Sequence, residues 1–367
     1  MAKIDHLFDI LLERDGSDLH LLEGQRPKIR QYGQLINLKD EPVLDGATIR
    51  DYLQEICSED QWKLFQKNRD LDFAYGRVES SRFRANYYFQ HHGIGGVFRI
   101  IPHRILSIDD LELPQILKVF AQQRSGLILV TGPTGCGKST TLAAVLDYIN
   151  EHYSRYILTI EEPIEFVHVN KKSIFCQREV GGDVKSFSDA LRSAQRQDCD
   201  VILVGEMRDY ETISLAVSAA SVGKLVFGTL HTNSAVKTVD RIIDVYPPDE
   251  QLKARNMLGD SLYAVCAQIL LKRADGSGRV VANEILINTY ALASSIREGS
   301  TANIRHTIQT GKDLGMQFLD DSIADLLGKG IIDNHEAHLK AHNKQRFRIQ
   351  TEQEENLILD SVPLEGT

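Results

Sequence analysis

Residues 132–139 read Gly-Pro-Thr-Gly-Cys-Gly-Lys-Ser and match the phosphate-binding pattern G-x-x-x-x-G-K-[ST] at every fixed position. The residues before this loop, 127–131, are apolar or β-branched, which is typical of a buried parallel strand. The residues after it, 140–149, contain neither Gly nor Pro and repeat apolar side chains at helical spacing. Because strand, glycine loop and helix follow in this order, the sequence predicts a phosphate-binding loop within an α/β sheet.

The residue types in this loop suit a nucleoside triphosphate. Glycine lets backbone N–H groups converge on a phosphate without steric conflict, and the following helix adds the positive end of its dipole. We expect Lys138 to reach the β- and γ-phosphates and the hydroxyl of Ser139 to bind Mg²⁺. The flanking strand and helix disfavour the alternative, a glycine turn that binds nothing. The expected binding residues are Gly132, Pro133, Thr134, Gly135, Cys136, Gly137, Lys138 and Ser139.

Length and composition limit the class of protein. With 367 residues, the chain is long for a single domain, and two domains of about 150 residues each are expected. Its hydrophobic and charged fractions, 42% and 25%, are those of a soluble globular protein. No apolar stretch approaches the roughly 18 residues of a membrane span, and the first residues do not resemble a signal peptide.

Charge and cysteine content narrow the class further. The net charge of −9 argues against general nucleic-acid binding. It therefore disfavours a RecA-like motor that acts on DNA. The five cysteines are scattered without a C-x-x-C pair, which argues against a structural zinc site. Their scatter also favours a reducing compartment, so a cytoplasmic location is expected.

The first part of the chain, 1–101, is expected to be a separate small α/β domain. Amphipathic helices are expected at 4–12, 49–56 and 59–66, and short strands at 18–22, 27–30, 71–75, 82–89 and 96–101. Residues 102–112 are expected to link this domain to the second, which spans 113–343.

The second domain alternates strands with helices as far as about residue 290, which is typical of an open, doubly wound parallel sheet. Besides the strand before the loop, strands are expected at 156–160, 201–204 and 225–230. Residues 344–367 are polar and rich in charge, and they are expected to form a flexible tail.

Polar side chains follow three of these strands, where ligands bind in open α/β sheets. Glu206, after 201–204, is expected to be the acid that holds Mg²⁺ or orients water, with Glu161 as a second carboxylate. His231, after 225–230, is expected to donate a hydrogen bond to the γ-phosphate, and Arg208 to organise the acids or bridge subunits. Taken singly, each residue has a structural alternative, a helix N-terminal acid or a solvated side chain. Their joint placement beside a phosphate loop favours a catalytic site.

The strand expected at 82–89 carries arginines on its polar face. Alternation places Arg82 and Arg84 opposite an apolar face, and Arg99 lies on the next expected strand. One interpretation is a solvated polar face over a core. The other is that these arginines reach the nucleotide of a neighbouring subunit, where they stabilise charge on the transferring phosphoryl group.

Four ordered motifs of the chain resemble those of the type IV pilus retraction ATPases, the PilT family within the type II/IV secretion ATPase superfamily. They are the Walker A loop at 132–139, an Asp box at 159–168, a Walker B segment at 202–209 and a His box at 228–233. Shorter matches at 17–20, 98–102, 241–244 and 308–311 extend the resemblance over nearly the whole chain.

The resemblance implies an N-terminal PAS-like domain, a RecA-like P-loop ATPase domain and a helical C-terminal extension. It also implies a homohexamer that binds ATP between the N-terminal domain of one subunit and the RecA-like domain of its neighbour. Mg²⁺-dependent hydrolysis would then turn a PilC-like platform protein of the inner membrane and remove pilins from the pilus base, as twitching motility requires. Paralogous pilus ATPases are further expected partners, and the expected location is the cytoplasmic face of the inner membrane.

The resemblance also implies roles for individual residues. The phosphate-loop roles fall on Lys138, Ser139 and Thr140. Glu206 becomes the catalytic or Mg²⁺-water carboxylate with Glu161 as its partner, His231 becomes the His-box residue, and the arginines acting in trans are drawn from Arg82, Arg84 and Arg99.

Three segments depart from the family pattern. Glu162 stands where the Asp box has Asp, and 196–200 reads Arg-Gln-Asp-Cys-Asp in place of Arg-Glu-Asp-Pro-Asp. The retraction signature A-I-R-N-L-I-R-E appears at 291–298 as Ala-Leu-Ala-Ser-Ser-Ile-Arg-Glu, so only its end matches. Two alternatives therefore stay open. One is a divergent paralogue that serves as an auxiliary motor or energises pilus extension or type II secretion, and the other is a nucleotide-dependent scaffold with negligible turnover.

Overall fold

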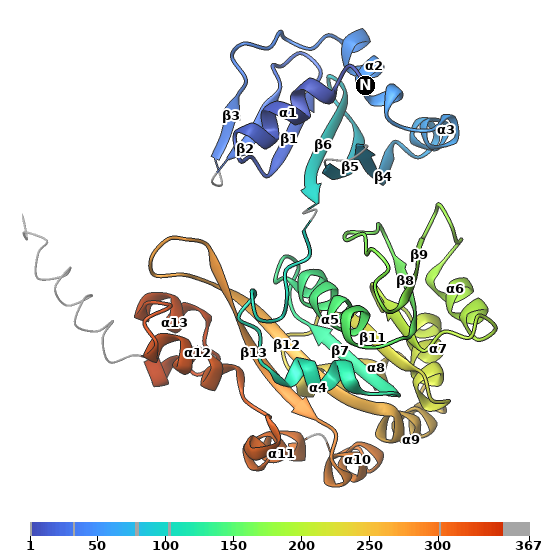
Figure 1. Ribbon diagram of the computed structural model, residues 1–367, viewed down its shortest axis with the longest axis vertical. Helices are drawn as coiled ribbons and strands as arrows, with labels where there is room; N and C mark the ends of the chain where they lie inside the picture. The colour runs from blue at the N-terminus through green and yellow to red at the C-terminus, as the bar shows by residue number, and fades with distance from the viewer. Residues whose placement is uncertain (1, 32–33, 78–80, 102–103, 301, 348–367) are drawn as a thin grey trace, which may run out of the picture. The chain divides into compact units, whose positions relative to one another are not determined.

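The computed structural model describes residues 2–31, 34–77, 81–101, 104–300 and 302–347. They divide into two structural units, which Figure 1 draws with the element labels used below. The first unit runs to residue 105 and includes the loop Glu162–Val167, whereas the second contains Leu106–Glu161 and the chain from His168 onward. The Asp-box loop is thus grouped with the N-terminal unit, although the strand that leads into it belongs to the second.

The first unit is built on a six-stranded antiparallel sheet in the order β3-β2-β1-β6-β5-β4. The strands are β1 (Asp18–Leu22), β2 (Lys28–Gln31), β3 (Gln34–Asn37), β4 (Asp70–Arg77), β5 (Ser81–Gln90) and β6 (Gly93–Ile101). Its helices are α1 (Asp5–Glu13), α2 (Gly46–Glu55) and α3 (Glu59–Asn68). Every expected helix and strand of this region is present, and β3 is an additional edge strand.

The core of the first unit follows from the two periodicities of its sequence. On α1, Leu7, Phe8 and Leu11 recur at helical spacing and are fully buried, and the ring of Phe8 stacks on Phe83 at 4.1 Å between centroids. On β5, alternate residues from Phe83 to Tyr87 are buried, whereas Arg84 between them is only half-buried. The arginines of β5 therefore lie on the face away from this core, as predicted.

The second unit contains a seven-stranded sheet in the order β13-β12-β7-β11-β10-β8-β9. Its strands are β7 (Gly126–Thr131), β8 (Tyr156–Glu161), β9 (Ile174–Glu179), β10 (Val201–Val204), β11 (Leu225–Leu230), β12 (Leu262–Lys272) and β13 (Arg279–Ile287). Strands β7 to β12 pair in parallel, and β13 pairs antiparallel with β12. The predicted strand–helix alternation therefore ends in a hairpin, β12–β13, which no sequence pattern singled out.

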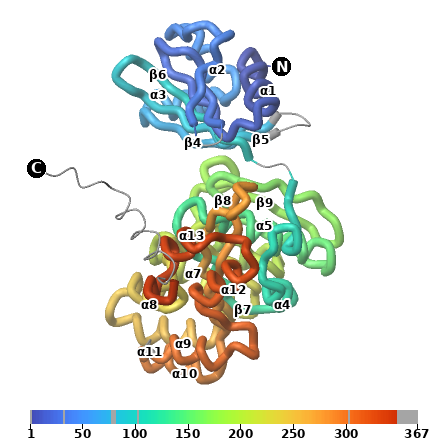
Figure 2. The backbone as a smooth tube through the Cα atoms, turned by 90° about the vertical axis from the view of Figure 1, so that its left-hand side faces the viewer, coloured from blue at the N-terminus to red at the C-terminus, as the bar shows by residue number. Residues whose placement is uncertain are grey.

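Helices cover both faces of this sheet. Alternate residues of β7 separate the two cores, because Leu127 and Leu129 pack on one face and Ile128 and Val130 on the other. The second face is covered by α4 (Ile116–Gln122) and α5 (Lys138–His152). The first face is covered by α6 (Phe187–Ala194), α7 (Tyr210–Ser221), α8 (Ala235–Asp244), α9 (Gln251–Ser261), α10 (Tyr290–Arg297) and α11 (Ala302–Thr310). Helices α9, α10 and α11 lie side by side (Figure 2).

The last described helices pack on the β12–β13 hairpin. They are α12 (Leu319–Gly328) and α13 (Asn334–Lys340), with the short 3₁₀ turns η1 (Lys312–Leu314) and η2 (Lys344–Phe347). Phe347 is buried in this cluster, and residues 348–367 of the expected tail lie outside the described residues. None of the helices in the described ranges has the length and apolar character that a membrane span requires.

Candidate nucleotide-binding site

The phosphate loop joins the end of β7 to the start of α5, as predicted. Gly132 has φ of +144°, and a Cβ there would lie 2.2 Å from the backbone oxygen of Gln268. Gly137 is the N-cap of α5 and has φ of +87°, which disfavours residues with a side chain. Glycine is therefore required at Gly132 by the close approach of β12 and is favoured at Gly137 by the backbone conformation.

Lys138 folds back over this loop. Its ammonium donates hydrogen bonds to the backbone oxygens of Gly132 (2.9 Å) and Pro133 (3.2 Å), so its positive charge lies at the loop itself. The next residues, Ser139 and Thr140, lie half-buried in the first turn of α5. Neither hydroxyl makes a hydrogen bond with another residue in the described ranges, so both are available to a phosphate or a metal ion. This donor set fits Mg²⁺ held between a hydroxyl and phosphate oxygens.

The strand order brings the three predicted acid and histidine positions to one edge of the sheet. Because β11, β10 and β8 follow β7 in parallel, their carboxyl ends lie together with the start of the loop. Glu161 is the last residue of β8, Glu206 follows β10, and His231 follows β11. His231 thus follows β11, the neighbour of β7, and Glu206 follows β10, which lies one strand further from the loop.

Glu206 is the centre of a charged cluster. Its carboxylate accepts a hydrogen bond from Arg208 Nη2 at 2.6 Å, and its Oε1 lies 2.9 Å from His231 Nε2. Partial burial raises the pKa of Glu206, but the hydrogen bonds and charges of Arg208 and His231 outweigh this effect, so its pKa lies below the ordinary value. Glu206 is therefore ionised at neutral pH, and it can accept a proton or a hydrogen bond from a metal-bound water.

Glu161 has a different set of partners. Its Oε1 accepts a hydrogen bond from Thr159 Oγ1 at 2.7 Å and from Gln177 Nε2 at 3.4 Å. The end of β10 passes close to it, because a Cβ on Gly205 would lie 3.2 Å from the Glu161 Cα. Two carboxylates thus follow neighbouring strands, and Glu206 contacts an arginine and a histidine.

A cavity of about 480 Å³ adjoins the phosphate loop. Its lining includes loop and helix residues together with apolar side chains, among them Cys136, Gly137, Thr140, Leu106, Leu111 and Leu270. At its border, Arg273 lies 3.4 Å from Glu112. This size and lining suit a nucleoside whose phosphates enter the loop. The cavity has no signal in the sequence, because part of its lining comes from residues 106–112, which were expected to be a linker, and part from β12 and β13, which carry no motif.

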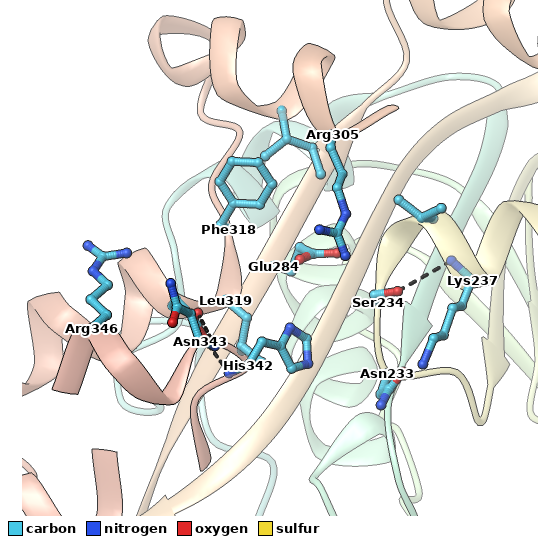
Figure 3. Close-up of a pocket in the computed structure, with 13 residues that line it drawn as sticks. Asn233, Ser234, Lys237, Glu284, Arg305, Phe318, Leu319, His342, Asn343 and Arg346 are labelled. Atoms are coloured by element: carbon cyan, nitrogen blue, oxygen red, sulfur yellow. Dashed lines mark hydrogen bonds between the residues drawn. The ribbon is translucent and has the colours of Figure 1, made fainter. Parts of the chain in front are cut away.

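The segment after His231 is anchored by a residue that no motif marks. Glu284 of β13 accepts a hydrogen bond from the backbone N–H of Ala235 at 2.7 Å, at the start of α8. Together with Ser234 and Arg305, Glu284 lines a second cavity of about 650 Å³ (Figure 3). Burial raises the pKa of Glu284. The only signal for this residue in the sequence is a charged side chain within an apolar run.

The predicted arginines lie in the first unit, and the phosphate loop lies in the second. Arg84 and Arg99 face each other in the register of β5 and β6, and Arg82 lies two residues earlier on β5. Arg84 donates to Asp72, which is the main cause of the raised Arg84 pKa, and Arg99 Nε donates to Asp18 at 2.8 Å. Their reach to a nucleotide of another subunit stays a prediction.

Comparisons with known proteins show the family to which the chain belongs. The sequence pattern of the family described as "Type II/IV secretion system protein" matches residues 98–358. The type IV pilus retractation ATPase PilT of Pseudomonas aeruginosa is 47% identical over 346 residues, which cover 94% of this chain and 99% of that protein. A twitching motility protein of Neisseria gonorrhoeae is 47% identical over 321 residues, which cover 87% of this chain and 85% of that protein.

A solved structure shows the same fold. The crystal structure of the pilus retraction motor PilT with bound ADP superposes with a TM-score of 0.87 at 39% identity, covering 94% of this chain and 98% of that one. The predicted α/β class and the resemblance to the PilT family are therefore confirmed.

Proposed function

Because the chain belongs to the family of type II/IV secretion system proteins, we propose that it is an ATP-hydrolysing motor that powers the retraction of a type IV pilus. The observation that carries this proposal is the contact of Glu206 with His231 at the strand ends beside the phosphate loop. This contact joins two of the family motifs, the Walker B segment and the His box, in a chain that aligns with a pilus retraction ATPase along almost its whole length.

The ligand is ATP with Mg²⁺. Loop 132–139 holds the phosphates, Lys138 neutralises part of their charge, and the hydroxyls of Ser139 and Thr140 supply ligands at the start of α5. Mg²⁺ would be held by Ser139 and, through water, by Glu206, and when bound it neutralises charge on the phosphates. The nucleoside occupies the cavity beside Gly137.

Glu206 acts as the base that orients and deprotonates the attacking water. It is suited to this role because its lowered pKa keeps it ionised, and because His231 holds one of its oxygens. Arg208 forms an ion pair with the same carboxylate. This ion pair must weaken when Glu206 accepts a proton from the water, because the carboxylate then loses its charge. Glu161 supports the site from the next strand and is the alternative base.

The active assembly is a homohexamer. Arg84, Arg99 and Arg82 would serve the nucleotide of a neighbouring subunit, where they would stabilise charge on the transferring phosphoryl group. Their location in a unit without a phosphate loop supports this part of the proposal. The hexamer works at the cytoplasmic face of the inner membrane, turns a PilC-like platform protein, and cooperates with paralogous pilus ATPases.

The test combines an enzyme assay with a genetic one. The purified chain is expected to hydrolyse ATP in the presence of Mg²⁺, and Lys138→Ala to abolish turnover. Deletion of the gene is expected to leave cells hyperpiliated and without twitching. A copy of the unmodified gene should restore twitching, whereas a copy that encodes Lys138→Ala should not. An active enzyme whose loss leaves retraction intact would contradict the retraction role.

One observation favours a second candidate, a paralogue with another task. The segment 291–298 forms most of α10, where Leu292 and Ile296 are buried in the core. Positions 292–295 differ from the retraction signature, and Tyr290, the first residue of α10, is 89% exposed. If deletion of the gene abolishes pilus assembly, the chain powers the extension of a pilus. If deletion abolishes secretion, the chain energises type II secretion or another filament. Normal binding with negligible turnover would indicate a scaffold.

A further inference from the structure

Gln268 connects β12 to both parts of the phosphate-binding element. Its side-chain amide donates from Nε2 to the backbone oxygen of Cys136 in the loop at 2.7 Å. Its Oε1 accepts from Thr141 Oγ1, in the first turn of α5, at 3.1 Å. The residue is 1% exposed, so these bonds form away from water.

The backbone of Gln268 supports the other end of the loop. Strand β12 makes its last pair with β7 at Ala267 and Thr131, and it then continues alongside the loop. A Cβ on Gly132 would lie 2.2 Å from the Gln268 oxygen, so the loop starts in direct contact with this strand. One residue thus contacts the beginning of the loop, its end and the helix that follows.

A packing role alone would not require an amide at this position. An apolar side chain of similar size would fill the same space, but it would leave the Cys136 carbonyl and the Thr141 hydroxyl without their buried partner. A phosphate loop binds its ligand more tightly when its N–H groups already point toward the phosphate position. If the groups must first align, the free energy of that alignment is subtracted from the free energy of binding. The amide holds the loop in that arrangement.

We propose that Gln268 is a positioning residue that pre-forms the phosphate loop and thereby sets the affinity for nucleoside di- and triphosphates. The proposal rests on the proposed function in one respect, namely that the loop binds a nucleotide. It does not depend on what the motor moves.

The test compares two buried amides at opposite ends of α5, Gln268 beside its first turn and Asn150 within its last turn. Gln268→Met, which keeps the size and removes both hydrogen bonds, is expected to weaken ADP binding by about tenfold in calorimetric titration of the full chain. The matched control is Asn150→Leu. Asn150 is fully buried, donates to the Val169 oxygen and accepts from the Lys171 N–H, and lies near the C-terminal end of the same helix. It is expected to lower the melting temperature with ADP affinity unchanged.

A second pair of variants decides the matter if Gln268→Met does not fold. Thr141→Val removes the hydroxyl and is expected to weaken ADP binding about fivefold, and Thr141→Ser is expected to restore it. Where Gln268→Met does fold, a double-mutant cycle is expected to show a smaller loss of ADP affinity for Thr141→Val in the presence of Gln268→Met than alone.

The proposal is overturned if Gln268→Met, or Thr141→Val in its place, binds ADP like the unmodified chain. It is also overturned if Asn150→Leu weakens ADP binding equally, because general destabilisation would then explain the loss. These binding results are independent of turnover and of cell phenotype. An unmodified chain that binds ADP but neither hydrolyses ATP nor retracts pili would instead contradict the proposed function.

Discussion

At the level of single residues, the chemistry of the site depends on how Glu206 keeps its charge. Glu206→Gln preserves the shape of the side chain and its contact with His231, but it cannot accept a proton. We expect turnover to fall by at least about a hundredfold. ADP affinity should change little, because the loop holds the phosphates. A steady-state ATPase assay with calorimetric titration measures both, and Glu161→Gln is the control. A larger loss of turnover in Glu161→Gln would assign the base to Glu161.

The pH dependence of turnover tests whether the ion pair between Arg208 and Glu206 sets the pKa of Glu206. The pKa of Glu206 lies below its ordinary value, so its charge is present above the ordinary pKa and is lost as pH falls through the lowered one. Arg208→Ala removes a cause of this lowering, so the acid limb of the kcat/KM profile should shift to higher pH. The control is Arg192→Ala, which removes an arginine that pairs with Glu211 and does not contribute to the pKa shift of Glu206. An unshifted acid limb in Arg208→Ala would mean that another group titrates.

At the level of elements, Glu284 connects β13 to the start of α8. Glu284→Leu leaves the Ala235 N–H without its buried acceptor, and we expect a loss of about 1–3 kcal/mol in the free energy of unfolding. Glu284→Gln keeps an acceptor oxygen and should cost less. Urea denaturation monitored by circular dichroism measures the difference. Equal losses in the two variants would show that the negative charge, rather than the acceptor, stabilises this junction.

Elements also differ in how well their own sequences predict them. Strands β7, β8, β10 and β11 are short apolar runs bounded by polar residues, and they appear where predicted. The edge strand β9 was missed because its side chains are partly exposed and mixed in polarity. The β12–β13 hairpin was missed because β12 follows α9 without an intervening loop. Its pairing with β7 joins residues far apart in the chain.

At the level of the whole molecule, the proposal that subunits share a nucleotide site can be tested by mixing two inactive variants. Lys138→Ala subunits and Arg84→Ala subunits should each be inactive alone. If Arg84 acts in trans, mixed hexamers contain some sites with both an intact loop and an intact arginine, so part of the ATPase activity should return. Absence of rescue, with mixed assembly verified by mass spectrometry, would count against Arg84. Repeating the mixture with Arg99→Ala tests the next candidate.

The sequence by itself determined the phosphate loop, the polar residues that end the strands and the apolar face of β5. These features are encoded in contiguous residues, through glycine geometry and through the periodicities of helix and strand. The contact of Glu206 with His231, the amide of Gln268 beneath the loop and the nucleoside cavity were decided only by the tertiary structure. Each joins segments that are distant in the chain, and the order β12-β7-β11-β10-β8 brings them together. That order results from packing the whole sheet between its helices, which no local pattern specifies.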